Sequence, residues 1–544
     1  IKMKKHITLT IALLISYSAN AQWQWAKKIG GSQFDGGFTL VDASNSSYCL
    51  GIFEGACYFD NDTLYSSGVN DIFFAKYDVA GNKLWAKRIG GNNPLNFTEN
   101  VNSTGIFIDN TNNCIYFSGQ YYGSMTIDSY TISGTGSMDL FLAKFDLNGN
   151  CLWLKRAASS LEDESSRVSI DPNGNVYWAG NFNWTNGFVD TTPVAKGWFF
   201  AKFDSSGNLI SVTPYFINEG IIGYFSVSNS EILVSGSSYN DTLVINVNDI
   251  VVGSNTIDGF LFKMDLNLNV IWAKKFGGNT SSWDYPTTFD EDANGNIYLV
   301  GGFQDTLTID GNTITNSGKK DMFIAKFSNN GNLIWARQAN ATGSLVTIAY
   351  MNKMDIDGLV YVAGTFSGSA SFGNFNINAS NTQEMFIARY DSNGDCIGVR
   401  HLGWAEGRSV DVDSNGDIVV AGIFINTINI GSTSLTSYGG GDMFFAKSDA
   451  IVGIGGREIN PNNQLIIYAN PTAGKCNITV PDDFVNEKNL TLSIYDNTGK
   501  LIQQKILEMN DGKIKVSLEQ EAKGIYNVTL ANKKKSYSGK IVFE

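Results

Sequence analysis

Histidine is nearly absent from this chain of 544 residues, which removes much of the chemistry that an enzyme could perform. Only His6 and His401 occur. Histidine is the most frequent acid–base catalyst, and Ser-His-Asp triads and many zinc sites depend on it. No nucleophile or base stands in a recognisable motif beside His401, so the sequence predicts no catalytic residue.

Carboxylates are the most numerous groups that could take part in acid–base chemistry. The chain has 52 Asp and Glu against 39 Lys and Arg, a formal charge of −13. Two carboxylates are sufficient for glycoside hydrolysis, so carboxylate-dependent chemistry stays open. The acidic balance argues against nucleic acid or an anionic membrane as a partner, because both bind basic surfaces.

One acidic turn resembles the start of a calcium-binding loop, in which oxygen ligands stand at positions 1, 3 and 5 before a glycine. Its residues are Asp411, Asp413, Asn415 and Asp417. Position 12 carries Gly422 in place of glutamate, and Asp, Asn and Gly are also the residues that a hairpin turn requires. The turn is the favoured interpretation. Calcium is the one cofactor candidate.

The chain is built from a repeated strand-like phrase, Phe-x-Ala-Lys followed by an aromatic residue and Asp. It occurs seven times at intervals of roughly 60 residues, a period typical of repeat architectures. One basic residue marks each copy: Lys76, Lys144, Lys202, Lys263, Lys326, Arg389 and Lys447.

Other residue types recur at fixed distances from each marker. An acid precedes it, glycine follows in a turn, and tryptophan stands further on, as in Asp71, Gly81 and Trp85. Six acids at equivalent turns indicate a structural role. His401 falls in a column where other copies have Arg88 or Arg156, so a structural role is predicted for it too.

The two ends of the repeat complement each other. The seventh copy lacks its tryptophan strand, whereas the N-terminal segment from Trp25 to Gly31 matches that from Trp85 to Gly91 without a marker before it. We therefore predict an all-β fold, a seven-bladed β-propeller over residues 22–450 closed by the N-terminal strand. The repeats resemble those of secreted bacterial β-propellers, a likeness that implies the fold without naming a ligand.

The termini predict export. Residues 1–21 have a basic start, a short apolar stretch and a small-residue end, the pattern of a signal peptide. No other stretch is long enough to span a membrane as a helix. Residues 451–463 are a Gly/Asn/Pro linker, and the alternating apolar segments of residues 464–544 predict a small antiparallel β-sandwich.

The C-terminal segment resembles the type A C-terminal sorting domain of the type IX secretion system of Bacteroidetes. The resemblance rests on blocks beginning at Tyr468, Ile494 and Lys523 and on the end of the chain; Ala469 replaces a proline that is usual in the family. The matching positions are Asn470, Pro471, Gly474, Gly499, Lys500, Gly524 and Tyr526. This resemblance implies that the type IX secretion machinery is a partner and that the product is secreted or attached to the cell surface.

Ligand candidates are aromatic residues in the loops expected on one face of the ring. Four follow the tryptophan strands and one follows a second strand: Phe34, Phe97, Trp283, Trp404 and Trp184. Exposed rings suit stacking on sugars or contact with a protein, but each ring could instead pack into its own blade.

These features predict a non-enzymatic, secreted or cell-surface binding and adhesion scaffold for a glycan or an extracellular protein. The alternative is a carboxylate-dependent polysaccharide-active enzyme, a hydrolase or lyase, with its site in the propeller channel. A purely structural surface component is a third interpretation.

Overall fold

The computed structural model describes residues 23–451 and 465–544, with short gaps that include 34, 91–94, 97–104, 279–282, 344–347, 485–489, 497–500 and 508–512. The predicted signal peptide, nearly all of the linker, Phe34, Phe97, Gly499 and Lys500 lie outside the described residues. Within them the chain is built from strands, and no helix is long and apolar enough to cross a membrane. The all-β class is confirmed.

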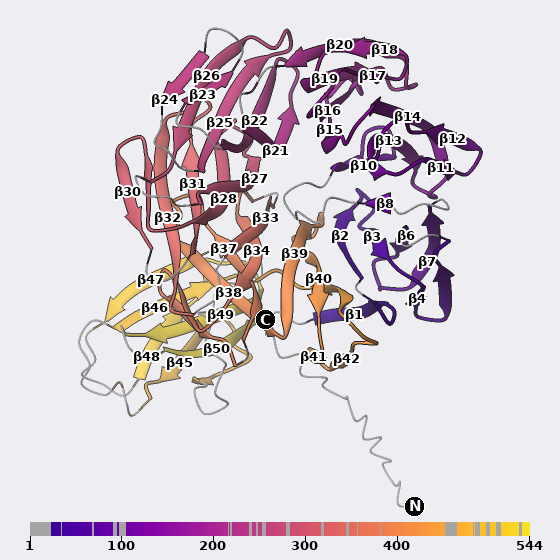
Figure 1. Cartoon of the computed structure of the whole chain (residues 1–544). Helices are drawn as coiled ribbons and strands as arrows, with labels where there is room; N and C mark the ends of the chain where they lie inside the picture. The colour runs from indigo at the N-terminus through magenta and orange to yellow at the C-terminus, as the bar shows by residue number, and fades with distance from the viewer. Residues whose placement is uncertain are drawn as a thin grey trace, which may run out of the picture.

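Antiparallel groups of four strands with the same topology follow one another along the chain and around a common centre (Figure 1). The first three groups are β2 (Gly36–Val41), β3 (Ser47–Phe53), β6 (Asp71–Tyr77), β7 (Lys83–Ile89); β9 (Gly105–Asp109), β10 (Cys114–Tyr121), β13 (Asp139–Asp146), β14 (Cys151–Ser159); and β15 (Glu164–Ile170), β16 (Val176–Phe182), β19 (Gly197–Phe203), β20 (Leu209–Tyr215). The short β8 (Leu95–Asn96) also pairs with β10.

The later groups repeat the pattern, and the last takes its outer strand from the N-terminus. They are β21 (Gly220–Val227), β22 (Glu231–Ser238), β25 (Asp258–Asp265), β26 (Val270–Phe276); β27 (Tyr285–Glu291), β28 (Ile297–Phe303), β31 (Asp321–Phe327), β32 (Leu333–Ala341); β33 (Ile348–Met354), β34 (Val360–Phe366), β37 (Glu384–Tyr390), β38 (Cys396–Gly403); and β39 (Ala405–Val412), β40 (Ile418–Phe424), β43 (Asp442–Ser448), β1 (Trp23–Gly30).

Each group carries a short extra hairpin between its second and third strands. The hairpins are β4 (Ala56–Phe59) with β5 (Asp62–Tyr65), β11 (Ser124–Ile127) with β12 (Tyr130–Ser133), β17 (Gly187–Val189) with β18 (Thr192–Val194), β23 (Thr242–Ile245) with β24 (Asp249–Val252), β29 (Thr306–Ile309) with β30 (Asn312–Thr315), β35 (Ser369–Phe372) with β36 (Phe375–Asn378), and β41 (Thr427–Ile430) with β42 (Thr433–Thr436).

The marker strands are central, and neighbouring groups cover both of their faces. In β31, Met322 and Ile324 pack into the core shared with the following group, while Phe323 and Ala325 pack into the core shared with the preceding one. Side chains alternate across a strand, so a strand buried on both faces has an unbroken apolar run. This explains why the repeated phrase is apolar rather than alternating.

The marker lysine is buried because it meets an acid from the first hairpin of its own group. The Lys447 ammonium lies 2.6 Å from Asp413 Oδ2, and the Arg389 guanidinium lies 2.8 Å from Asp355 Oδ2. Burying a charge is costly unless it is paired and hydrogen-bonded. In six of the seven described groups the marker forms such an ion pair, whereas Lys144 donates to Ser205 O instead.

Tryptophan of one group packs on glycine of the next. A Cβ added at Gly149 would lie 2.7 Å from the Trp85 ring, and one added at Gly81 would lie 2.6 Å from Trp25. Both glycines have positive φ, +74° and +80°. Glycine is required at these turns because it adopts positive φ readily and because a side chain would clash with the tryptophan ring.

One exception shows that the tryptophan and glycine columns depend on each other. The third group has Ser211 in the tryptophan column, and the next group has Leu268 in place of glycine, with φ +66°. Leu268 is buried in the core that these two groups share. Where the ring is missing, a leucine side chain fills the space despite its strained backbone.

Gly149→Ala is expected to destabilise the fold by about 2–4 kcal/mol, because strain at positive φ adds to the clash with Trp85. Gly55→Ala is the matched control: φ is also +74°, but nothing lies within 4 Å of the added Cβ. It should cost only about 1–2 kcal/mol. Urea unfolding of both variants checks the difference, and equal losses would show that Trp85 does not restrict this position.

The C-terminal residues form two further antiparallel sheets around their own core. One contains β44 (Ile466–Tyr468), β45 (Lys475–Thr479) and β48 (Lys513–Ser517). The other contains β47 (Leu501–Leu507), β46 (Leu490–Tyr495), β49 (Gly524–Ala531) and β50 (Ser536–Phe543). Ile478, Leu492, Val528 and Ile541 are buried between them. The expected β-sandwich architecture is present in this segment.

Candidate functional site

The first strands of successive groups lie side by side on the inner side of the arrangement. β27 packs against β33, β33 against β39, and β39 against β2. Side chains from four different groups can therefore meet here, although their residues are far apart in the sequence.

Four inner strands, β21, β27, β33 and β39, are bulged at the same place in the repeat. The bulge in β33 lies between Ala349 and Met351, and that in β39 between Gly407 and Ser409. A bulge turns an extra side chain out of the regular alternation and is common beside functional sites. The extra residues are Tyr350 and Arg408, and the Arg408 guanidinium lies 5.3 Å from the centre of the Tyr350 ring.

Beside them, a lysine lies over two aromatic rings. Lys320 Nζ is 5.0 Å from the centre of the Trp283 ring and 5.4 Å from that of Tyr285. Burial lowers the pKa of Lys320, although nearby Asp284 acts in the opposite direction. Tyr285 is close enough to Tyr350 for the two hydroxyls to influence each other electrostatically. We call Trp283, Tyr285, Lys320, Tyr350 and Arg408 the aromatic–cation patch.

Asp284 holds the loop that presents this patch. Its carboxylate accepts hydrogen bonds from the backbone N–H of Gly278 at 2.8 Å and of Gln304 at 3.0 Å, and its own N–H donates to Ile257 O at 2.9 Å. The buried aspartate between Trp283 and Tyr285 therefore fixes both aromatic residues relative to the sheet.

The same loop aspartate recurs between other groups, where it lies beside the acid that precedes the marker. Asp163 donates its N–H to Met138 O at 2.8 Å, and its carboxyl lies close enough to Asp139 for the two to interact electrostatically. Asp35 is similarly close to Asp442. Burial, reinforced by the neighbouring carboxylate, raises the pKa of both Asp163 and Asp35 to about 7.

Asp163→Asn is expected to make the chain relatively more stable as pH rises. Because burial raises the pKa of Asp163 to about 7 from its ordinary 3.8, the folded protein retains a proton that the unfolded chain loses. Wild-type stability therefore falls between about pH 4 and pH 7 through this group, whereas asparagine does not titrate.

The unfolding free energy of Asp163→Asn minus that of wild type should rise by about 2–3 kcal/mol from pH 5 to pH 8. Chemical denaturation at several pH values measures this difference. Asp357→Asn, at an exposed turn, controls for the loss of one carboxylate. A difference for Asp163→Asn that stays constant with pH would show that the carboxyl pair does not hold a proton.

A second polar cluster lies further along the inner strands. Lys353 Nζ is 3.7 Å from Asp290 Oδ2, and Asp411 Oδ2 accepts the backbone N–H of Val41 at 2.8 Å. Asp290 raises the pKa of Lys353, burial raises that of Asp411, and burial raises that of Tyr224 to about 12. We call Tyr224, Asp290, Lys353 and Asp411 the inner cluster.

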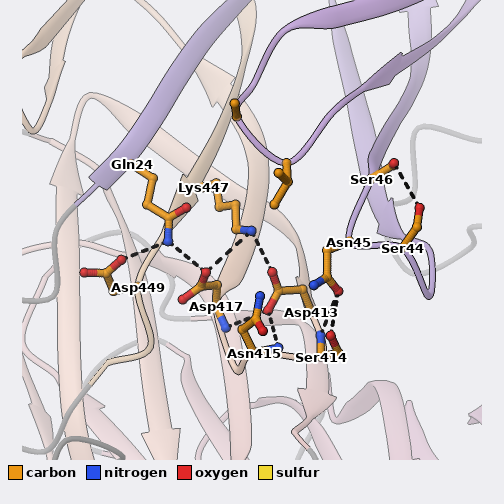
Figure 2. A network of polar contacts seen from close by, with 12 residues as sticks. Gln24, Ser44, Asn45, Ser46, Asp413, Ser414, Asn415, Asp417, Lys447 and Asp449 are labelled. Atoms are coloured by element: carbon orange, nitrogen blue, oxygen red, sulfur yellow. Dashed lines mark hydrogen bonds and ion pairs between the residues drawn. The ribbon is translucent and has the colours of Figure 1, made fainter.

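The four calcium candidates do not converge on one point. Figure 2 shows Asp413 and Asp417 around the Lys447 ammonium, with Gln24 of β1 donating to Asp417 at 2.8 Å. Asp413 Oδ1 accepts the backbone N–H groups of Asn415 and Asp417, whereas Asp411 belongs to the inner cluster. Among the described residues, no group of three or more His, Cys, Asp or Glu is placed to hold a metal ion.

His401 pairs with the acid of its own group, as its alignment with arginine positions suggests. Its Nδ1 lies 2.6 Å from Glu384 Oε2, and Arg88 similarly lies 2.8 Å from Asp71.

The described aromatic candidates occupy three different environments. Trp283 is 54% exposed and belongs to the aromatic–cation patch, while Trp184 is 67% exposed in the loop after β16. Trp404 is half-buried against the core of its own group. The sequence analysis did not identify Lys320, Tyr285, Tyr350 or Arg408, because none stands in a repeated column. Only Tyr285 stands near Trp283 in the sequence, so no sequence signal connected Trp283 with the other three residues.

The described sorting residues connect the two ends of the C-terminal module. The Asn470 side chain donates to Lys540 O at 2.5 Å and accepts the N–H of Val542 at 2.7 Å, while Thr472 N–H donates to Val542 O. Pro471 lies between these contacts. Gly474 has φ +108°, and the Tyr526 hydroxyl donates to Ala522 O near Gly524. The first block of the predicted signal is thus held against the last strand.

A comparison with known protein families identifies this module. Residues 466–544 match the family described as the secretion system C-terminal sorting domain. An uncharacterized WD repeat-containing protein of Acanthamoeba polyphaga mimivirus is 25% identical over 515 residues, 75% of this chain, so this chain spans only 36% of that relative.

Two solved structures illustrate the range of structural similarity. The Dos1 propeller has 9% identity and a TM-score of 0.36, over 77% of this chain and 95% of its own. Dimeric latent PorU from Porphyromonas gingivalis has 9% identity and a TM-score of 0.13, over 69% of this chain and 32% of its own. The chain is a β-propeller repeat protein whose residues 466–544 match the family of secretion system C-terminal sorting domains.

Proposed function

We propose that seven four-stranded blades form a closed ring and that β1 is the closing strand. β1 pairs with β43 from Trp23 opposite Ser448 to Ile29 opposite Met443. Trp25 packs on Gly81 of the first group as Trp85 packs on Gly149 of the second. The junction between the last group and the first therefore uses the same contact as an internal junction.

We further propose that the type IX secretion machinery exports this ring and that it acts outside the cell as a binding and adhesion scaffold, not as an enzyme. The sorting domain supports the route, and a secreted or surface-attached product follows from it. The observation that carries the binding function is the aromatic–cation patch, where one exposed tryptophan, two tyrosines and two cations from three adjacent groups gather. Aromatic faces stack on sugars and on protein side chains alike, and among these ligands we favour a glycan.

Trp283→Ala is expected to weaken glycan binding at least tenfold, because stacking area and the cation–aromatic contact are lost together. A glycan array followed by titration of the best-bound saccharide measures the effect on the purified full-length protein. Trp184→Ala is the matched control, since that ring is also exposed but lies in another group. Unchanged affinity in Trp283→Ala would refute the patch as the binding site.

The inner cluster favours a second candidate, a carboxylate-dependent polysaccharide-active enzyme, hydrolase or lyase. Asp411 has a raised pKa and lies with Asp290, Lys353 and Tyr224, so acids and bases of different strength meet there. Reducing-end and unsaturated-sugar assays on a panel of polysaccharides test it. Turnover that Asp411→Asn abolishes would support it, and the absence of turnover across the panel would refute it.

A further inference from the structure

The aromatic–cation patch holds a positive charge that the described protein residues do not neutralise by direct contact. Lys320 lies over the faces of Trp283 and Tyr285 and forms no hydrogen bond or ion pair with a described residue, although the nearby Asp284 carboxylate attracts its charge without direct contact. Burial lowers its pKa, so the charged form lacks part of the solvation that water would provide. The chain as a whole carries −13. An anionic ligand in direct contact with the partly buried Lys320 ammonium would stabilise its charge.

The second cation of the patch is held differently. Arg408 Nη2 lies 2.5 Å from Glu406 Oε2, and Glu406 Oε1 accepts a hydrogen bond from Gln383 at 2.7 Å. The Arg408 charge is therefore matched within the protein, and its role is to hold the Tyr350 ring face. This leaves Lys320 as the cation available for a ligand, with Trp283 beside it as an exposed apolar face.

We propose that the patch binds an acidic glycan, with a sugar ring on Trp283 and the carboxylate of that sugar or its neighbour on Lys320. This inference rests on the proposed glycan-binding function and names its ligand class. A carboxylate forms a charge-assisted hydrogen bond with the ammonium, while the ring stacks on the indole. The net negative charge of the protein repels polyanions in general, so the attraction must come from the local contact with Lys320.

The test compares oligogalacturonate with its methyl ester, which has the same sugar rings without the charge. The wild-type full-length protein should bind the acid about tenfold more tightly than the ester at low salt, and the preference should shrink as salt rises. Lys320→Met keeps a long apolar side chain and should bind both forms equally. Lys320→Arg should retain the preference, and Lys196→Met controls for loss of an exposed lysine elsewhere.

The outcomes distinguish failure of the acidic-glycan assignment from failure of the proposed glycan-binding function. Wild-type protein could bind both forms equally through Trp283, or the preference for the acid could survive in Lys320→Met. Either result would overturn the acidic-glycan assignment and leave glycan binding intact. Binding of neither form, with no other saccharide bound on the array, would overturn both. Polyglutamate that competes as strongly as oligogalacturonate would show that an acidic peptide is the ligand and overturn the glycan assignment.

Discussion

Trp25→Ala is expected to lower the free energy of unfolding of the propeller by about 3–5 kcal/mol, the loss typical of a large buried aromatic residue. The Trp25 ring packs against Tyr77 and Phe445, and its indole N–H donates to Val79 O at 3.1 Å. These partners belong to the first and the last group. The substitution therefore acts where the first and the last group meet, and urea unfolding measures its effect.

The interpretation of this loss depends on two comparisons. Trp283→Ala removes an exposed ring and should leave stability nearly unchanged, which separates burial from residue type. Gly81→Ala should be strongly destabilising in wild type, where its Cβ would lie 2.6 Å from the Trp25 ring, and much less so in the Trp25→Ala background. Additive losses, or a Trp25→Ala variant as stable as wild type, would refute closure of the ring by β1.

Removal of residues 466–544 is expected to abolish delivery to the outside of the cell and to leave the propeller in the periplasm. These residues are the sorting domain, and among the described residues its buried core contains only residues from Leu465 onward. The cores of the propeller groups contain none of them, so the truncated chain keeps its own buried contacts. Protease accessibility on intact cells, with fractionation, measures the change.

A less disruptive variant tests the same prediction without truncation. Asn470→Leu removes the contacts of Asn470 with Lys540 and Val542. If these contacts form the recognised surface, delivery should fall while the propeller stays folded. Trp283→Ala should be exported normally, because it lies outside the sorting domain. Surface display of the truncated chain at the wild-type level would refute the assignment of the export route.

Repetition made the fold predictable. The N-terminal tryptophan segment matched the outer strand of an internal copy, and the structure pairs it with β43. The glycine column was interpreted as a turn, and positive φ at Gly81 and Gly149 confirms the turn. The contact of each glycine with a tryptophan of the preceding group was not predicted, because it joins residues of different repeats that no local pattern connects.

The acidic turn shows why spacing alone did not define a site. Asp411, Asp413, Asn415 and Asp417 have the intervals of a calcium loop, but β39 ends at Val412, between the first two. Asp411 therefore keeps strand geometry and reaches Val41 of the first group, whereas Asp413 begins the turn and reaches Lys447. The same intervals lead to two places because the backbone conformation changes within them.

The sequence by itself determined the architecture, the sorting domain and the scarcity of histidine chemistry, because each depends on residue types at repeated or contiguous positions. Only the tertiary structure showed which residues form the aromatic–cation patch. It brought Lys320 over Trp283 across the four strands β27 to β30 and placed Tyr350 beside Arg408 at the bulges of adjacent strands. The strands of a propeller recur with one period, so their positions can be predicted from sequence spacing. The residues of the aromatic–cation patch come from three different groups and do not recur in type. Their proximity depends on how neighbouring groups pack, which sequence spacing does not reveal.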